Sequence, residues 1–160
     1  MLNDLLRAHH AGVSRWGNNT DLNSSSIGIE IDNNGTDSFS VQQISSLLVL
    51  LGRLKRAYNI PTTNFIGHAD VAPGRKVDPN RTFLWQRLAE QGYGCWYDTA
   101  GVQLPADFNP MQALRIIGYS VKKPESAIAS FKLHFVPSDS SLTITDEQKK
   151  ILWSLQKKYE

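Results

Sequence analysis

The sequence is poor in the features that build several common kinds of protein. Among its 160 residues there is one cysteine, Cys95. An internal disulfide framework and a zinc site of the paired-cysteine type are therefore excluded. Cys95 lies in an aromatic-rich stretch, between Gly94 and Trp96, which favours a packed and unreactive thiol. No run of about 20 apolar residues is present, so we expect no membrane-spanning segment.

An excess of charge of one sign is also missing. The 17 lysines and arginines against 15 aspartates and glutamates leave a net charge of +2, and the basic residues are scattered. This distribution gives no electrostatic support for nucleic-acid binding, and we expect no such partner. The opening residues 1–7 combine an acid with the absence of a long apolar core, which is not typical of a secretory signal. The composition is that of a globular chain with one or two small domains.

The stretch richest in chemistry covers residues 67–79, Gly-His-Ala-Asp-Val-Ala-Pro-Gly-Arg-Lys-Val-Asp-Pro. Its glycines and prolines argue against a helix. His68 and Asp78 are ligand types that suit Zn²⁺, and Lys76 can share a face with Asp78 in an extended segment. A metal ion with a cation beside it stabilises a developing oxyanion. A surface loop with ordinary charges is the alternative interpretation.

A second candidate site residue lies in residues 26–32, Ser-Ile-Gly-Ile-Glu-Ile-Asp. Three isoleucines alternate there with polar or small residues, and this period of two predicts a β-strand. The pattern places Glu30 on the face opposite the isoleucines, with Gly28 leaving room beside it. Two interpretations stay open from the residues alone: Glu30 is a catalytic carboxylate, or it belongs to the solvated face of an edge strand.

Helical periodicity is clearest in residues 40–58, where Ser40 and Gln43 form a capping box before an apolar stripe. Residues 63–66 predict a short strand and residues 83–91 a short helix. This order of strands and helices favours an α/β fold with a mixed sheet flanked by helices. Because two strands rarely form a stable sheet alone, we expect further strands upstream or support from a partner.

The second part of the chain predicts a small helical bundle. Residues 99–108 resemble a linker, and three helical patterns follow in residues 109–160. Asn109 can cap the first helix, Pro124 opens the second, and Thr145 starts the third as part of a capping box. A core of three short helices is marginal in size, so we expect it to need docking against the first domain.

Three blocks of the sequence, taken in order, resemble a known family. They are residues 10–16 (His-Ala-Gly-Val-Ser-Arg-Trp), residues 21–30 and residues 67–79. Their order and spacing are similar to those of the N-acetylmuramoyl-L-alanine amidase family, whose zinc amidase fold is shared with peptidoglycan recognition proteins. The resemblance implies a zinc amidase domain over residues 1–98.

The resemblance also implies a reaction and a set of site residues. The reaction is zinc-dependent hydrolysis of the amide between N-acetylmuramic acid and the L-alanine of the stem peptide, in peptidoglycan or in muropeptides. His68 and Asp78 fall on zinc-ligand positions. Glu30 falls on the position of the catalytic acid and base, and Lys76 on that of the residue assisting the tetrahedral intermediate. The position of His10 borders the substrate groove.

Two further assignments are less specific. Arg75 can bind stem-peptide carboxylates with two parallel hydrogen bonds, although a solvated loop arginine is the alternative. Residues 111–119 resemble the start of a peptidoglycan-binding three-helix domain, so residues 109–160 are expected to form one. A generic helical tail is the alternative interpretation of this part.

One feature departs from the family pattern. The family's first zinc ligand is a histidine on a strand upstream of residues 10–16, whereas this sequence begins nine residues before that block. We therefore expect an N-terminally incomplete zinc amidase fold, with weak or no activity in this chain alone. A non-catalytic peptidoglycan-binding protein, or an inactive truncated homologue, is the alternative. We expect a monomer in the periplasm or cell envelope, with the cytoplasm as the alternative compartment.

Overall fold

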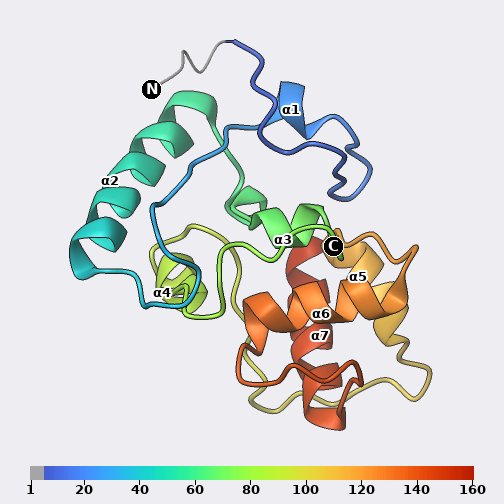
Figure 1. The fold of residues 1–160 in the computed structure, drawn as a ribbon. Helices are drawn as coiled ribbons and strands as arrows, with labels where there is room; N and C mark the ends of the chain where they lie inside the picture. The colour runs from blue at the N-terminus through green and yellow to red at the C-terminus, as the bar shows by residue number, and fades with distance from the viewer. Residues whose placement is uncertain (1–5) are drawn as a thin grey trace.

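The regular structure of this chain is helical. The computed structural model describes residues 6–160, so the very start of the sequence considered above for a signal lies partly outside it. Within these residues there are seven α-helices and one 3₁₀ turn (Figure 1). They are α1 Leu22–Ser25, α2 Val41–Tyr58, η1 Thr62–Asn64, α3 His68–Val71, α4 Trp85–Glu90, α5 Pro110–Ile117, α6 Pro124–Phe135 and α7 Asp146–Tyr159.

The predicted mixed sheet is wrong for the part of the chain that the structure describes. The β-pairing found there is a single isolated bridge between Trp16 and Asn19. No strand of the described residues lies beside residues 26–32, yet their alternation is real. Ile29 and Ile31 pack against the core under α2, whereas Glu30 is exposed. A period of two reports that one face of an extended segment is buried, and here a helix covers that face instead of a sheet.

The region before the 67–79 stretch also differs from its prediction. Residues 62–64 form a 3₁₀ turn where a strand was expected, and Phe65 after it is extended. His68 then begins α3, a single helical turn inside a stretch expected to be non-helical. Gly67 before it and the Ala-Pro-Gly sequence after it confine the helix to four residues. The glycines and prolines thus limit the length of the helix without preventing it.

The longer helices were predicted correctly because their start signals are local. In α2, the Ser40 hydroxyl accepts from the Gln43 amide at 3.1 Å and the Gln43 side chain accepts from the Ser40 amide at 2.9 Å. The same reciprocal pair forms between Thr145 and Gln148 at the start of α7. Asn109 caps α5 through its side-chain oxygen. Each cap satisfies backbone amides that the first turn of a helix leaves without partners.

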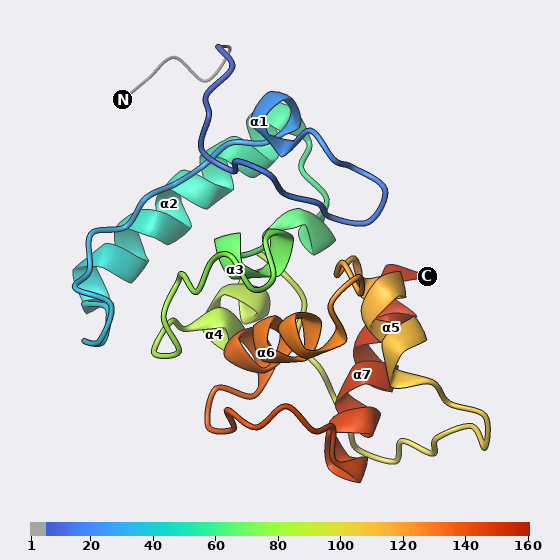
Figure 2. The same cartoon turned by 45° about the vertical axis from the view of Figure 1, so that its right-hand side comes forward.

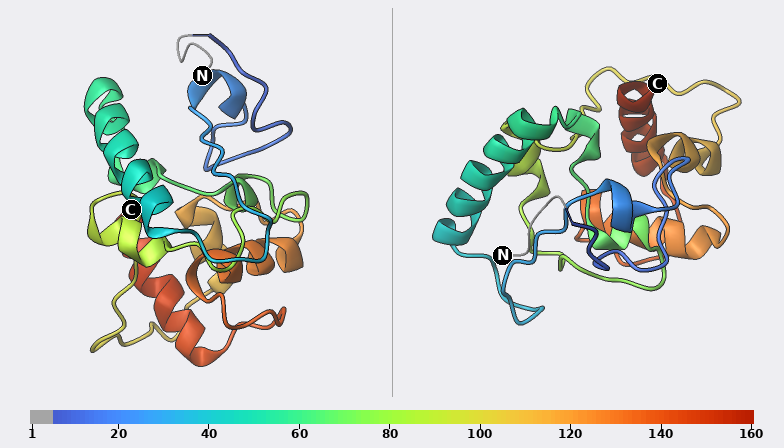
Figure 3. Two further views of the ribbon diagram at one scale, coloured as in Figure 1. Left: turned by 60° about the vertical axis from the view of Figure 1, so that its left-hand side comes forward. Right: turned by 90° about the horizontal axis from the view of Figure 1, so that it is seen from above.

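Three hydrophobic clusters hold these helices. In the ribbon, α3 lies between α2 and α6 (Figures 2 and 3). The largest joins α5, α6 and α7 and includes Trp16 and Trp96 from the first part of the chain. The second lies between α2 and α4. A small third cluster includes Val71 of α3, and Trp16 packs against it. The division into domains 1–98 and 109–160 stays a prediction. Across residues 6–160, no helix combines the length and the apolar character needed to cross a membrane.

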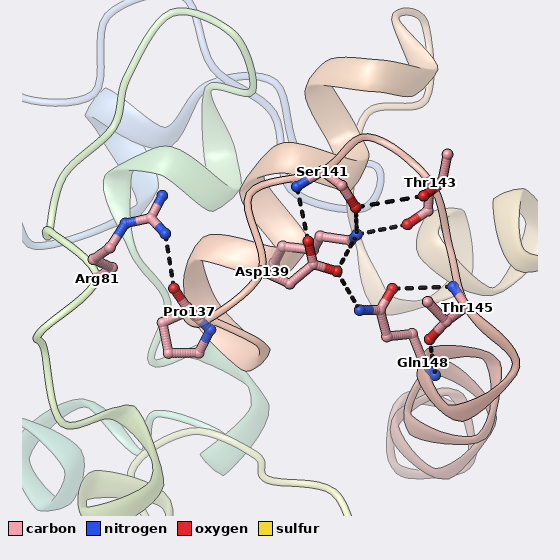
Figure 4. A network of polar contacts seen from close by, with 8 residues as sticks. Arg81, Pro137, Asp139, Ser141, Thr143, Thr145 and Gln148 are labelled. Carbon is pink, nitrogen blue, oxygen red and sulfur yellow. Dashed lines mark hydrogen bonds and ion pairs between the residues drawn. The ribbon is translucent and has the colours of Figure 1, made fainter.

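A buried lysine fixes the loop between α6 and α7 (Figure 4). The Lys132 side chain is 1% exposed, and its ammonium group donates to Asp139 at 2.7 Å, to the Ser141 hydroxyl at 2.9 Å and to the Thr143 carbonyl. These three bonds use all three ammonium protons, which offsets the loss of hydration. The hydrogen bond from Lys132, reinforced by one from Gln148, holds the pKa of the Asp139 carboxyl well below its usual range.

The depressed pKa of Asp139 predicts how stability depends on pH. A carboxyl whose pKa is lowered by folding stabilises fully above its unfolded pKa of about 3.9, and this contribution is lost as the pH falls below that value. We expect Asp139→Asn to lower the urea midpoint of unfolding at pH 7. The difference in midpoint between wild type and variant should then become steadily smaller from pH 4 to pH 2. The exposed Asp107 provides the control variant Asp107→Asn. A gap of constant size over this pH range contradicts the prediction.

Candidate functional site

The predicted zinc-binding pair is in contact. His68 is the first residue of α3, and Asp78 lies in the loop that follows α3. The Nδ1 atom of His68 is 3.0 Å from a carboxylate oxygen of Asp78. The backbone reinforces this contact, because the Ala69 amide donates to the Asp78 carbonyl at 2.8 Å. The loop therefore returns to the start of α3 and brings together two side chains ten residues apart.

The types and spacing of these two donors fit a zinc ion. At 3.0 Å, His68 Nδ1 either donates its proton to the Asp78 carboxylate or, when unprotonated, can share a metal ion with it. Two ligand atoms on one tetrahedral zinc lie about 3.3 Å apart. The Nε2 atom of His68 is buried and has no partner among residues 6–160, which leaves Nδ1 as the atom able to bind a metal. Within residues 6–160, no third histidine, cysteine or acidic side chain joins the pair.

The segment that carries Glu30 contacts His10 near its start. The His10 Nε2 atom is 3.2 Å from the Ser26 carbonyl oxygen. Its ring covers Gly28 so closely that a Cβ atom there would lie 2.6 Å from His10 Nδ1. Because positions 28 and 30 share a face when side chains alternate, His10 lies on the Glu30 side of this segment. A side chain larger than hydrogen at position 28 would displace the imidazole.

The far end of this segment is tied to the loop after Asp78. The Asn80 side chain donates to the Asn33 side-chain oxygen at 2.9 Å. Glu30 therefore lies, exposed, between two points of attachment to the site loops. Among the described residues, no hydrogen bond or ion pair joins Glu30 or Lys76 to the His68–Asp78 pair. The catalytic roles of Glu30 and Lys76 stay predictions.

Arg75 binds backbone in this structure. Its Nε donates to the Val13 carbonyl at 3.1 Å and its Nη2 to the Ala11 carbonyl. The Ala11 amide in turn donates to the Asn23 side chain at 2.9 Å. These bonds fix the loop that follows His10 against the loop that follows α3. The substrate-binding roles expected of Arg75 and His10 stay predictions.

A buried acidic residue that sequence reasoning missed lies two positions after His68. Asp70 is 1% exposed, and it accepts hydrogen bonds of 2.7 Å from Gly67, Tyr119 and His134. Two of these partners are 49 and 64 residues away, so no local spacing reveals them. The available signal is the apolar surroundings of Asp70, between Ala69 and Val71, since an acid on a buried turn requires partners.

The sequence matches characterised proteins over most of its length. The family model for N-acetylmuramoyl-L-alanine amidase matches residues 1–81. The N-acetylmuramoyl-L-alanine amidase AmiD of Escherichia coli (strain K12) is 34% identical over 177 residues, which covers 95% of this chain and 64% of AmiD. The 1,6-anhydro-N-acetylmuramyl-L-alanine amidase AmpD of Enterobacter cloacae is 38% identical over 82 residues, covering 51% of this chain and 44% of AmpD. The chain thus spans less than two thirds of the length of these curated relatives.

Solved structures agree with the sequence matches. E. coli AmiD in complex with the substrate anhydro-N-acetylmuramic acid-L-Ala-D-gamma-Glu-L-Lys superposes with a TM-score of 0.86 at 33% identity, covering 99% of this chain and 72% of that one. AmpDh3 from Pseudomonas aeruginosa, in complex with an anhydromuramic pentapeptide, gives a TM-score of 0.86 at 32% identity with the same coverage. Since the family model covers just over half of the sequence and the structural likeness nearly all of it, this chain belongs to the N-acetylmuramoyl-L-alanine amidase family.

Proposed function

We propose that this protein hydrolyses the amide between N-acetylmuramic acid and L-alanine, with Zn²⁺ as its cofactor. The observation that carries the proposal is the contact between His68 and Asp78, which joins two donor types of a catalytic zinc site in a chain of an amidase family. Two structures of relatives contain anhydro-muramyl peptides, which supports a muropeptide as the substrate class.

His68 and Asp78 are the residues proposed to hold the zinc ion. When bound, zinc lowers the pKa of a coordinated water to about 7 and polarises the amide carbonyl. His68 would contribute Nδ1, because its Nε2 is buried. Asp78 is 58% exposed and leaves its side of the pair open to substrate and to a further ligand. A catalytic zinc takes three protein ligands, so this pair is part of the full set.

Glu30 and Lys76 are assigned the remaining chemistry. Glu30 would take the proton from the attacking water and pass it to the leaving amine, since an unactivated amide needs both a base and an acid. Lys76 lies two residues before Asp78 on the same loop and would place a positive charge near the developing oxyanion. His10 would border the substrate, and Arg75 would bind a stem-peptide carboxylate through the guanidinium protons that it does not donate to Val13 and Ala11.

The compartment, the oligomeric state and the role of the C-terminal helices are also part of the proposal. A chain that acts on wall fragments is proposed to work as a monomer in the periplasm or cell envelope. Residues 109–160 are proposed to form a peptidoglycan-binding unit next to the amidase part, with α5, α6 and α7 as its helices.

Metal binding gives the first test. We expect the purified chain to bind zinc in an equilibrium titration, and His68→Ala and Asp78→Asn each to weaken this binding by at least tenfold, measured by competition with a chromogenic chelator. Each variant removes one ligand from the set. Asp107→Asn, at an exposed site, is the matched control. If the wild-type chain binds no zinc and releases no peptide from an anhydro-muropeptide, the enzymatic proposal is wrong for this chain.

Glu30 gives the second test. We expect Glu30→Gln to lower kcat by about 10²- to 10⁴-fold, the usual range for a general acid–base group, while the zinc content stays the same. Peptide release from the anhydro-muropeptide is followed by chromatography and mass spectrometry. Glu125→Gln, on the exposed first turn of α6, is the control. A Glu30→Gln variant with wild-type kcat would remove Glu30 from the mechanism.

A further inference from the structure

A buried carboxylate connects the His68 turn to the C-terminal helices. One oxygen of Asp70 accepts from the Gly67 amide and from His134 Nδ1, and the other accepts from the Tyr119 hydroxyl, all at 2.7 Å. Gly67 precedes α3, Tyr119 follows α5, and His134 lies on α6. A charged group this deeply buried requires such a full set of donors. The carboxylate is therefore shared between the site loop and the helices after residue 109.

The backbone geometry shows how Asp70 acts on His68. Asp70 lies two residues after His68. Its carboxylate accepts a hydrogen bond from the amide of Gly67, the residue immediately before His68. A Cβ atom at Gly67 would lie 3.1 Å from the Asp70 carboxylate and 3.0 Å from the Trp85 ring, so glycine allows this close approach. The Ala69 amide, on the other side of His68, holds the Asp78 carbonyl. Fixing this turn fixes the backbone of both proposed zinc ligands.

The two distant donors are themselves rigidly packed. The His134 ring is stacked between Trp85 and Phe135, with ring centroids 4.0 Å apart on each side and interplanar angles of 17° and 14°. The Tyr119 ring packs edge-on against Trp16 at 5.2 Å. Burial, together with the neighbouring Asp70 charge, raises the pKa of Tyr119 well above its ordinary value, so its hydroxyl stays a donor. Neither donor can turn away from Asp70 without breaking aromatic packing.

We propose that Tyr119 and His134 are positioning residues which, through Asp70, allow the C-terminal helices to hold the α3 turn that presents His68. The role of this turn in zinc binding rests on the proposed function, whereas the mechanical coupling between the helices and the turn does not. The C-terminal helices thus contribute to the site from a distance, without touching the reacting atoms. This coupling also explains why an acid occupies a position surrounded by apolar residues.

Amide hydrogen exchange tests the coupling without requiring zinc or activity. We expect Tyr119→Phe and His134→Ala to speed exchange at the Gly67 and Ala69 amides by about five- to tenfold, because one hydrogen bond supporting the turn is lost. In His134→Asn the side-chain amide nitrogen lies two bonds from Cβ, as Nδ1 of histidine does, so it can still donate to Asp70. This variant should therefore keep the slow exchange of the wild type. The Leu51 amide in α2 should change by less than about twofold. Tyr97→Phe, which leaves the C-terminal contacts to Asp70 intact, should match wild type.

Zinc affinity gives the second readout. Loss of outer contacts that orient metal ligands typically weakens metal binding by about 10- to 100-fold, and we expect Tyr119→Phe and His134→Ala to weaken zinc binding by about tenfold. His134→Asn and Tyr97→Phe should retain wild-type affinity. Unchanged exchange at Gly67 and Ala69 in both deletion variants would overturn the proposal, as would an equal increase at Leu51. A wild-type chain that binds no zinc refutes the proposed function, while the exchange data still decide the coupling.

Discussion

The fold depends on the three hydrogen bonds that compensate the buried carboxylate of Asp70. Asp70 sits where three parts of the chain meet: the turn that starts α3, the segment after α5, and α6. Removing one of the three donors leaves the charge of a buried carboxylate only partly compensated, which costs more than the loss of an ordinary surface hydrogen bond. If the first part of the chain shifted against the C-terminal helices, the Asp70 carboxylate would therefore lose hydrogen-bond donors or become exposed to water. The arrangement of the site loop and the packing of the helices are set by the same contact.

The elements that sequence reasoning recovered are those specified by neighbouring residues. The start of α2 follows from Ser40 and Gln43, and that of α7 from Thr145 and Gln148, since each pair lies within one helical turn. The prediction of a strand at residues 26–32 was wrong, because alternation indicates that one face of a segment is buried and does not identify what buries it. Ile29 and Ile31 meet a helix-lined core, and no neighbouring strand is present in the part of the chain that the structure describes.

The contact between His68 and Asp78 was predictable for the same reason, whereas the roles of the site residues stay predictions. His68 begins α3 and Asp78 lies in the loop that follows it, so their contact falls within a stretch of eleven residues that a family resemblance singles out. The supporting carboxylate was not recoverable, because His134 and Tyr119 approach Asp70 only after the chain has folded across more than forty residues. Sequence patterns describe the residues that carry chemistry better than the partners that hold them, since those partners are selected by tertiary packing. Glu30 falls between these cases, with its exposed face predicted and its role resting on family resemblance.

The buried ammonium of Lys132 has a consequence for chemical labelling of this protein. With its side chain 1% exposed and three hydrogen bonds made by its nitrogen, this group is shielded from reagent in the folded chain. Acylating reagents should modify exposed amines such as those of Lys122 and Lys123 readily and leave Lys132 untouched until the loop between α6 and α7 opens. The extent of Lys132 modification, measured by mass spectrometry, would therefore report how often the loop between α6 and α7 opens.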